Sequence, residues 1–299
     1  MVKHFIDIDN FDKAELRKIL NFAKKIKKNP DKYSSLLQNK SLALMFIKQS
    51  MRTRLSFDIG MKKLGGNVIE LEPKDIGFGN RESEKDMMQV MSKFLDCLII
   101  RNDDHEQILK LSSINSLPII NGLSNFSHPC QILSDIFTIE EFLGNINDNI
   151  ICWIGDFNNV LVSLIQAAEI FHFKLNIALP TSILRSKKNY IDKLNLKNSN
   201  FFSEVSEASK DVNCIMTDTW FSMGEKKSIS KKRDLKKFQV DSKVMKFAKK
   251  NAIFMHCLPA HRNEEVTDLV IDSKQSVVLQ QAENRMYVQQ SILNFLINS

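Results

Sequence analysis

The sequence predicts an α/β fold in which parallel sheets are flanked by helices. Short apolar runs alternate with longer amphipathic stretches, and this order is typical of parallel strands that are connected by helices. Most of the short runs are apolar on both faces, as buried parallel strands are. At about 150 residues per domain, a length of 299 residues favours two such domains.

Each expected strand is a short apolar run, and each expected helix carries apolar residues at a spacing of three to four. The expected strands are Ser41–Ile47, Cys97–Arg101, Pro118–Asn121, Ile150–Asp156, Leu175–Leu179, Cys214–Asp218, Ala252–His256 and Ser276–Leu279. The expected helices are Lys13–Lys28, Arg52–Leu64, Glu84–Leu95, His105–Ser112, Gln131–Phe142, Leu161–Phe171, Lys243–Lys249 and Asn284–Ile297.

A domain boundary is expected near residues 134–150. An expected helix there runs into Gly144, and the mostly polar segment Asn145–Asn149 follows as a linker. A new series of strands and helices begins at Ile150. Farther along, Ser222–Ser242 is rich in lysine and serine and poor in apolar residues, so we expect a mobile loop there.

The chain is basic, with 42 lysines and arginines against 35 aspartates and glutamates, a net charge of +7. Such a charge suits nucleic acid, an acidic membrane surface or a small anionic substrate. The basic runs Lys24–Lys28 and Lys231–Lys237 are short and lack the interleaved aromatic residues of single-strand binders. We therefore interpret these runs as solvated helix faces and expect no nucleic-acid partner.

The five cysteines are odd in number and widely spaced, without a CxxC pair. This pattern favours a reducing compartment over a disulfide framework or a structural zinc site. The N-terminal segment turns acidic at Asp7, too early for a signal or transit peptide. No stretch approaches the ~18 apolar residues of a membrane span. The expectation is a cytoplasmic protein without a membrane partner.

The segment Ser50-Met51-Arg52-Thr53-Arg54 is the first candidate site, because it joins an expected strand to an expected helix. A helix N-terminus binds anions through its free N–H groups and its dipole. Ser50 and Thr53 add hydroxyl donors, and Arg52 adds a planar fork suited to phosphate. The alternative is a capping serine with solvated arginines, but the coincidence of these features favours an anion site.

Polar residues also follow other expected strands, where α/β proteins bind ligands. His128 and Gln131 are three residues apart and can reach one small polar group. Asn159 either faces a ligand or caps a helix, and Asp218 either holds an ammonium group or caps a loop. The second and third glycines of a dinucleotide fingerprint are missing after Gly155, so a Rossmann cofactor is not expected.

Cys257 stands at the end of an apolar strand. His256 directly precedes it, and His261 follows four residues later. A nucleophilic cysteine paired with either histidine is one interpretation, although no third partner is evident. The peptide bond between Leu258 and the following proline is a candidate cis bond. A cis bond there would point a backbone carbonyl group into the site. Arg285 lies where the last expected strand leads into the C-terminal helix, and it is either a helix-surface residue or another anion ligand.

Taken together and in this order, these segments resemble the aspartate/ornithine carbamoyltransferase family from Phe5 to the C-terminal helix. The Ser-x-Arg-Thr-Arg segment at 50–54 and the His-Pro-x-Gln segment at 128–131 match its carbamoyl phosphate signature. Asp218 with Ser-Met-Gly at 222–224, and His-Cys-Leu-Pro at 256–259, are similar to the ornithine branch. The resemblance implies carbamoyl transfer from carbamoyl phosphate to L-ornithine, giving L-citrulline, with no metal or organic cofactor.

The resemblance also implies a domain organisation, an assembly and a set of site residues. It implies a carbamoyl phosphate-binding domain of residues 1–137 and an ornithine-binding domain of residues 138–283. The C-terminal helix 284–299 would pack on the first domain. The implied assembly is a homotrimer or a multiple of it. The implied carbamoyl phosphate ligands are Ser50, Met51, Arg52, Thr53, Arg101, His128, Gln131, Cys257, Leu258 and Arg285. The implied ornithine ligands are Asn159, Asp218, Ser222 and Met223. The implied catalytic residues are Arg101, His128, Gln131, Asp218, Cys257 and Arg285.

Two departures from the family pattern keep alternatives open. The family usually has threonine at Met51, so one hydroxyl donor is lost, and related carbamoyltransferases for acylated ornithine can carry methionine there, which slightly raises that alternative. A carbamoyltransferase for another amine, such as N-acetylornithine or putrescine, is the nearest alternative. Gly77 stands where the family has a glutamine or histidine that reaches in from a neighbouring subunit, so that phosphate contact is either lost or made by the backbone. A non-catalytic nucleic-acid-binding protein, based on the net charge alone, is the remote alternative from another class.

Overall fold

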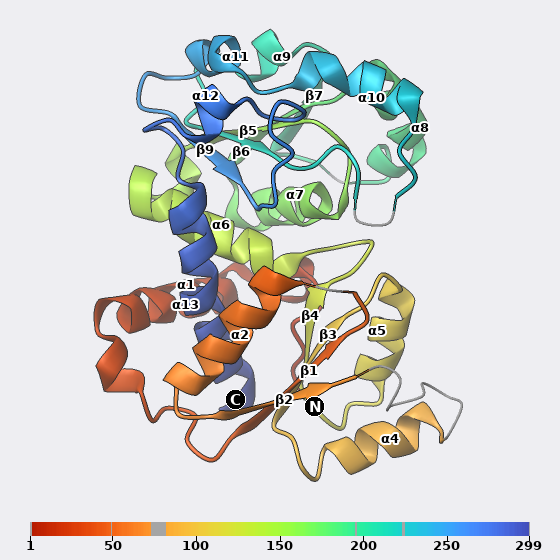
Figure 1. The fold of residues 1–299 in the computed structure, drawn as a ribbon, viewed down its shortest axis with the longest axis vertical. Coiled ribbons are helices and arrows are strands. Elements are labelled where there is room, and N and C mark those ends of the chain that lie inside the picture. The colour runs from red at the N-terminus through yellow and green to blue at the C-terminus, as the bar shows by residue number, and fades with distance from the viewer. Residues whose placement is uncertain (1, 49, 73–81, 195, 223–224, 299) are drawn as a thin grey trace. The chain divides into compact units, whose positions relative to one another are not determined.

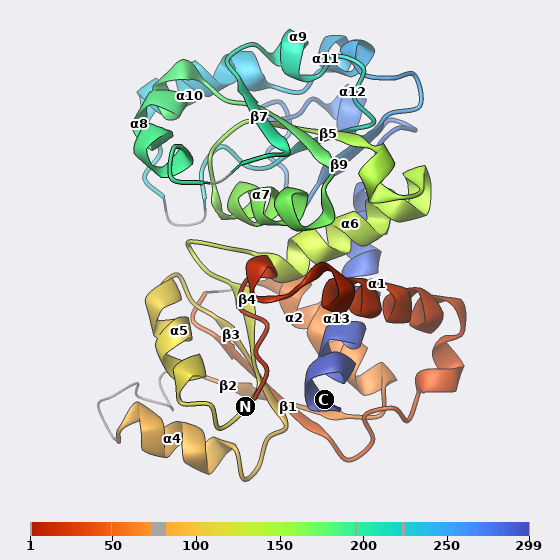
Figure 2. The same ribbon diagram turned by 180° about the vertical axis from the view of Figure 1, so that it is seen from behind.

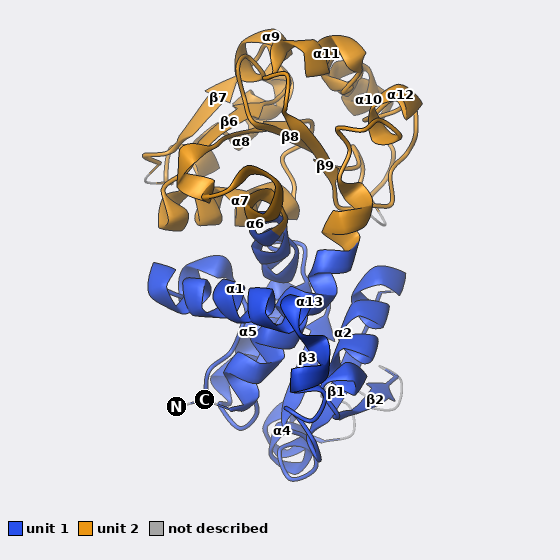
Figure 3. Ribbon diagram, turned by 90° about the vertical axis from the view of Figure 1, so that its left-hand side faces the viewer, with its two compact units in different colours: residues 1–137, 283–299 blue, residues 138–282 orange. Residues whose placement is uncertain are grey.

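The computed structural model of the chain describes residues 2–48, 50–72, 82–194, 196–222 and 225–298. The chain divides into two compact units, which Figure 3 colours separately. Unit 1 consists of residues 1–137 and 283–299, and unit 2 consists of residues 138–282. The chain passes between the units within helices α6 (Pro129–Leu143) and α13 (Val278–Ile297). Glu283, expected in the second domain, belongs to unit 1.

Unit 1 is built on a four-stranded parallel sheet with the order β2-β1-β3-β4 (Figure 1). Its strands are β1 (Ser41–Phe46), β2 (Asn67–Leu71), β3 (Cys97–Arg101) and β4 (Ile119–Leu123). Every residue of β3 is buried, because this strand is paired on both edges and apolar on both faces. Strand β2 was not expected. It lies at the sheet edge, where polar and exposed residues are tolerated.

The helices of unit 1 begin at polar capping residues. Ser50 caps α2 and Asp104 caps α5, and each side chain accepts a hydrogen bond from a backbone N–H of the first turn. Besides parts of α6 and α13, the helices of this unit are α1 (Lys13–Lys28), α2 (Met51–Lys63), α4 (Glu84–Met91) and α5 (His105–Ser113). Helix α4 ends four residues before the expected Leu95, since a turn follows Met91.

The C-terminal helix packs on unit 1, as expected. Figures 1 and 2 both show α13 beside α1 and α2. Ser291 Oγ donates to the carbonyl oxygen of Ile19 at 2.6 Å, and Gln290 Nε2 donates to that of Gly60 at 3.0 Å. A Cβ atom at Gly60 would lie 3.3 Å from Cγ of Gln290, so glycine permits the close approach of α2 and α13.

Unit 2 contains a five-stranded parallel sheet with the order β7-β6-β5-β8-β9. Its strands are β5 (Ile150–Ile154), β6 (Lys174–Ala178), β7 (Ser199–Phe202), β8 (Cys214–Thr217) and β9 (Ile253–His256). Its own helices are α7 (Asn159–Phe171), α8 (Thr181–Ile191), α9 (Val205–Ala208), α10 (Ile229–Leu235), α11 (Ser242–Phe247) and α12 (Asp268–Ile271). Because β5, β8 and β9 are neighbours, the residues that follow them meet at one edge of the sheet.

The expected strand Ser276–Leu279 is wrong. Ser276 forms only an isolated bridge with Phe254, and helix α13 already begins at Val278. Val278 is buried whereas Leu279 is 72% exposed, so this short apolar run presents one face to the core as the first turn of a helix does. A run of this length does not distinguish a strand from a helix end.

The expected mobile loop Ser222–Ser242 is wrong over its second half. This segment contains α10 and a 3-10 turn at Lys236–Phe238. Leu235, Phe238 and Val240 are buried and hold the otherwise polar segment in the core of unit 2. Three apolar residues are too few to reveal a helix from sequence alone, so the packing decides its conformation.

The two parallel sheets with flanking helices confirm the expected α/β fold class. None of the helices in the described ranges combines the length and the hydropathy that a membrane span requires. Helix α13 reaches 20 residues, but it carries Glu283, Arg285 and several glutamines.

Candidate active site

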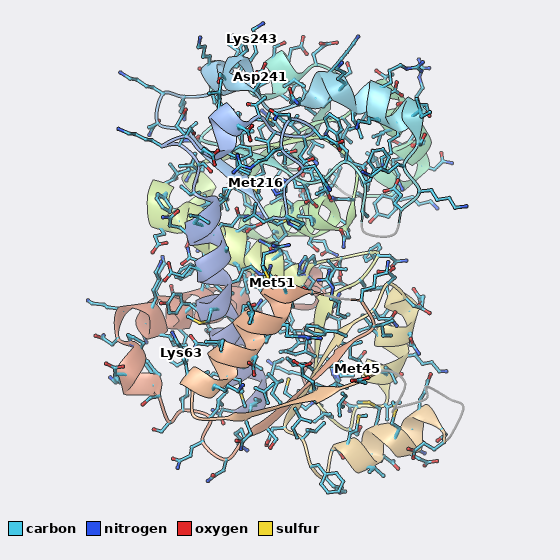
Figure 4. All side chains as sticks on the ribbon, in the orientation of Figure 1. Met45, Met51, Lys63, Met216, Asp241 and Lys243 are labelled. Atoms are coloured by element: carbon cyan, nitrogen blue, oxygen red, sulfur yellow. The ribbon has the colours of Figure 1, made fainter. Side chains whose placement is uncertain are left out.

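The N-terminus of α2 is built as the sequence predicts. Ser50 is the N-cap, and its Oγ accepts a hydrogen bond from the backbone N–H of Thr53 at 3.3 Å. Figure 4 labels Met51 and Lys63, which begin and end α2, and the Met51 side chain is 65% exposed. The half-buried Arg52 side chain makes no hydrogen bond or ion pair with another described residue. Its guanidinium is therefore available to an anion at this helix end.

Two buried arginine side chains converge on the hydroxyl of Thr53. Arg285 Nη2 donates to Thr53 Oγ1 at 2.7 Å, and Arg101 Nη1 donates to the same oxygen at 3.5 Å. Arg101 ends β3 whereas Arg285 lies in α13, so the fold brings together residues far apart in the sequence. Two guanidinium groups beside one neutral hydroxyl concentrate positive charge in a buried place, which suits a phosphate group.

His128 lies next to these charges, at the start of α6, and is 4% exposed. Burial lowers the pKa of His128 well below its usual value of 6.5, and the charges of Arg285 and Arg101 lower it further. The imidazole is therefore neutral near pH 7 and offers one N–H donor. A neutral donor beside two guanidinium groups can polarise a carbonyl oxygen and stabilise an oxyanion.

A buried hydrogen-bond network holds the turn that precedes His128. Asn121, in β4, donates through Nδ2 to Ser127 Oγ at 3.0 Å and to the carbonyl oxygen of Ile6 at 3.1 Å. The thiol of Cys130 donates to the carbonyl oxygen of Asn121 at 3.5 Å. Burial raises the pKa of Cys130 to about 12, so this group stays a thiol. Asn121 was not among the expected site residues, although an amide in an apolar strand is a signal for it.

Gln131 is buried one turn into α6 and faces Asp135. Its Nε2 donates to Asp135 Oδ1 at 2.8 Å. Asp135 was not among the expected site residues, although a spacing of four places two side chains on one face of a helix. Of the expected carbamoyl phosphate ligands, unit 1 brings together Thr53, Arg101, His128 and Arg285.

In unit 2, Asp218 is paired with residues that follow the two adjacent strands. Asn158 Nδ2 donates to Asp218 Oδ2 at 2.8 Å, and the Cys257 thiol donates to Asp218 Oδ1 at 3.1 Å. Asn158 also caps α7, since its Oδ1 accepts hydrogen bonds from two backbone N–H groups of the first turn. Asn159, the expected site residue, is the first residue of α7, whereas Asn158, which was not expected, is the N-cap and the partner of Asp218.

The Cys257 thiol donates its hydrogen bond to the Asp218 carboxylate and not to an imidazole. His256 Nδ1 accepts a hydrogen bond from the backbone N–H of Leu258 at 2.9 Å, and His256 Nε2 lies 3.2 Å from Glu265 Oε1. Both ring nitrogens are therefore engaged, and neither is left to take a proton from the thiol. These contacts do not support a nucleophile formed by Cys257 and His256. The bond between Leu258 and the following proline is cis, as expected.

The segment after β8 is tied to the end of β5. The backbone N–H of Ser222 donates to Glu225 Oε2 at 3.1 Å. Lys231 Nζ lies 2.7 Å from both Glu225 Oε1 and Asp156 Oδ2, and so links α10 to these two carboxylates. Met223 lies outside the described residues, and the expected ornithine contacts of Ser222 and Met223 stay predictions.

Asp218, His256 and Cys257 each bring one potential metal-ligating atom within 4.8 Å of the others. The carboxylate and the thiol are hydrogen-bonded to each other, and the imidazole is bonded to Leu258 and Glu265. A metal ion would have to displace these hydrogen bonds to be held here.

Both halves of the chain match one protein family. Residues 3–141 match the carbamoyl-P binding domain of aspartate/ornithine carbamoyltransferase, and residues 147–296 match its Asp/Orn binding domain. The chain is 44% identical over 305 residues to an ornithine carbamoyltransferase of Rhodopseudomonas palustris, with 100% of this chain and 98% of the relative covered. It is 42% identical over 301 residues to one of Ruthia magnifica, with 100% of both covered.

Solved structures of ornithine carbamoyltransferases have the same fold. The enzyme of Pyrococcus furiosus matches with a TM-score of 0.89 and 36% identity, covering 99% of this chain and 97% of that one. The anabolic enzyme of Campylobacter jejuni matches with a TM-score of 0.88 and 35% identity, covering 99% and 100%. These similarities span both units and agree with the order of the sequence motifs. The chain belongs to the aspartate/ornithine carbamoyltransferase family.

Proposed function

We propose that this chain transfers the carbamoyl group of carbamoyl phosphate to the δ-amine of L-ornithine, giving L-citrulline and phosphate. The observation that carries the proposal is the convergence of Arg101 and Arg285 on Thr53, beside a neutral His128. The similarity to proteins named ornithine carbamoyltransferase supports the same reaction.

Unit 1 binds carbamoyl phosphate in this proposal. The N-terminus of α2 receives the phosphate through its backbone N–H groups, the Ser50 and Thr53 hydroxyls and the Arg52 guanidinium. Met51 contributes its backbone only, since its side chain has no hydroxyl. Arg101 and His128 face the carbonyl oxygen, which becomes negative as the amine attacks. Each such preorganised donor stabilises the oxyanion by about 3–4 kcal/mol.

Unit 2 binds L-ornithine in this proposal. Asp218 accepts the α-ammonium group, and its bonds to Asn158 and Cys257 orient the carboxylate. A hydrogen bond of this charged kind contributes about 1.5–3 kcal/mol. Asn159 is a further proposed contact of the amino-acid end, together with Ser222 and Met223, and the Leu258 carbonyl is a proposed contact of the carbamoyl amide.

The proposed chemistry needs no strong base from the protein. The neutral δ-amine of ornithine attacks the carbamoyl carbon and forms the new C–N bond. The C–O bond to phosphate then breaks, and the departing phosphate takes the proton that the amine loses. Asp218 binds the ammonium group of ornithine, and the arginines bind the phosphate. Because the phosphate also takes the proton, the reaction as proposed uses no metal or organic cofactor.

Citrulline formation from carbamoyl phosphate with L-ornithine, N-acetylornithine or putrescine tests the proposal. L-Ornithine is expected to be the preferred amine, because Asp218 offers a charged partner to a free α-ammonium group. A preference for N-acetylornithine would overturn the substrate assignment. Retention on a polyanion that weakens with salt, without turnover of any amine, would instead favour a nucleic-acid-binding protein.

The pH dependence of turnover is expected to report the substrate amine rather than His128. The δ-amine resembles lysine, with a free pKa near ~10.4, so kcat/KM for ornithine should rise about tenfold per pH unit from ~6 to ~9. His128 stays neutral over this range, because its pKa is held well below 6.5 by burial and by two arginines. A profile measured with saturating carbamoyl phosphate that bends near pH 6.5 would contradict this.

We further propose a homotrimer, or a multiple of one, in the cytoplasm. An apolar stripe on α2 supports self-association: Met51, Leu55 and Ile59 follow one another at a spacing of four and are 65%, 51% and 40% exposed. All five cysteines are free thiols, which supports a reducing compartment. The expected departure at Gly77 lies outside the described residues.

Leu55→Lys is expected to convert the assembly to single chains, because it places a charge in the apolar stripe on α2. Light scattering should give a mass of three chains, or a multiple of three, for wild type and one chain for the variant. Leu269→Lys is the matched control, since Leu269 is 77% exposed on α12, outside the stripe. Loss of assembly in both variants, or in neither, would contradict the role of the stripe.

A further inference from the structure

Gln131 is buried in the first turn of α6, and its hydrogen bonding is asymmetric. Its Nε2 donates to Asp135 Oδ1 at 2.8 Å, and Asp135 is itself fully buried. The other end of the amide, Gln131 Oε1, is also buried, but it has no hydrogen-bond partner among the described residues. A buried amide oxygen without a hydrogen-bond partner lowers the stability of the fold, because it has lost its contacts with water. Such groups mark positions where a ligand or a water molecule binds.

The carboxylate of Asp135 determines which end of the Gln131 amide faces which way. Asp135 Oδ1 accepts the hydrogen bond that Gln131 Nε2 donates, so the amide NH2 faces Asp135. The amide oxygen Oε1 therefore faces away from Asp135. Without Asp135, the two orientations of an amide differ little in shape, and hydrogen bonding alone separates them.

The groups that converge on Thr53 in unit 1 supply hydrogen-bond donors, whereas Gln131 Oε1 is an acceptor. Thr53, Arg101, Arg285 and the neutral His128 offer O–H and N–H groups, which suit phosphate and carbonyl oxygens. A carbamoyl group differs from an acetyl group only in carrying NH2 in place of CH3. Recognising that difference requires an acceptor, and Gln131 Oε1 is one.

We propose that Asp135 is a positioning residue that holds the Gln131 amide with its oxygen towards the acyl substituent of the bound acyl phosphate. Oε1 then accepts a hydrogen bond from the carbamoyl NH2, and the site discriminates carbamoyl phosphate from acetyl phosphate. This inference rests on the proposed function, since it takes carbamoyl phosphate as the ligand. It adds the residue that determines selectivity for the acyl group.

The dissociation constants of carbamoyl phosphate and acetyl phosphate, measured by calorimetry without ornithine, test this proposal. Wild type is expected to prefer carbamoyl phosphate by at least ~100-fold, the scale for a site whose polar group is left unpaired by the wrong ligand. Asp135→Asn should lower this preference about tenfold, because an amide at 135 accepts or donates and no longer orients Gln131. Equal binding of both ligands to wild type would overturn the proposal whatever the variants do.

An exchange of the two side-chain types separates positioning from a merely structural role. Gln131→Glu alone sets two carboxylates against each other, and binding of carbamoyl phosphate should fall at least ~100-fold. In Gln131→Glu combined with Asp135→Asn, the new amide donates to one oxygen of the new carboxylate and leaves the other oxygen as acceptor. The double variant should therefore recover at least ~10-fold over Gln131→Glu alone.

Ser134→Ala is the matched control, because Ser134 is buried in the same turn and its Oγ donates to the carbonyl oxygen of Cys130 at 2.7 Å. This variant should lower the midpoint of urea unfolding without changing the ratio of the two dissociation constants. A double variant no better than Gln131→Glu, or an unchanged ratio in Asp135→Asn, would overturn the positioning role. Binding of carbamoyl phosphate with this preference, but without citrulline formation, would instead overturn the proposed function.

Discussion

Arg52→Ala is expected to lower kcat/KM for carbamoyl phosphate. The loss of transition-state stabilisation should be about 2–5 kcal/mol, which is the cost of losing one partner of a desolvated charge pair. That energy corresponds to roughly 30- to 5,000-fold in rate. The side chain makes no hydrogen bond or ion pair with another described residue, so its removal should affect ligand binding far more than folding. Steady-state kinetics and urea unfolding of the same variant measure the two effects separately.

Two further variants sharpen the test of Arg52. Arg52→Lys should restore only part of the activity, because an ammonium group cannot present a bidentate fork. Arg54→Ala is the matched control: Arg54 is two residues away on the same helix and exposed, and its Nε lies 3.4 Å from Glu70 Oε1. An exposed pair of this kind contributes little, so activity should stay close to wild type. Near wild-type activity in Arg52→Ala would refute the phosphate assignment.

Asp218→Asn is expected to damage ornithine turnover far more than carbamoyl phosphate binding. Wild type should prefer L-ornithine over N-acetylornithine and putrescine by at least ~100-fold in kcat/KM, since only ornithine offers Asp218 an α-ammonium group beside an α-carboxylate. The variant removes the charge that this ammonium requires. It also disturbs the bonds from Asn158 and Cys257, which both donate to the carboxylate.

Two measurements on wild type and on Asp218→Asn test this prediction. Kinetics give kcat/KM for each of the three amines, and calorimetry gives the affinity for carbamoyl phosphate. Asp241→Asn is the matched control, because Asp241 is the N-cap of α11 and is replaced by another good capping residue. It should leave all four values nearly unchanged. Equal losses of carbamoyl phosphate affinity and ornithine turnover in Asp218→Asn would show that the carboxylate does not act on the amine alone.

Much of the fold was predictable because buried parallel strands are apolar on both faces. Strands β1, β3, β5 and β8 all lie within the expected ranges for this reason. Of the four edge strands, β2 and β7 were missed, since their residues are mostly exposed or half-buried and lack the continuous apolar signal that the buried edge strands β4 and β9 keep. Ser276–Leu279 was assigned to the wrong element type, because a four-residue apolar run fits both a strand and a helix end.

The sequence also indicated which residue types would meet at the strand ends, but not their pairwise contacts. The Ser50 cap follows from local sequence, since its partner is only three residues away. The partners Asn158 of Asp218 and Asp135 of Gln131 depend on the sheet order and on the burial of α6. Asn158 gives no local signal of its partner, which is 60 residues away, whereas the spacing of four between Gln131 and Asp135 is a signal only once their helix is known to be buried.

By itself, the sequence determined the α/β class, the order of the site segments and the membership of a family whose motifs it carries. Those properties depend on short-range patterns, namely apolar periodicity and residue spacing within one turn or one strand end. Only the tertiary structure decided that Arg101 and Arg285, 184 residues apart, donate to the single hydroxyl of Thr53. Only the burial of His128 beside these two charges decided that its imidazole is neutral, because desolvation and Coulomb interactions depend on neighbours that are distant along the chain.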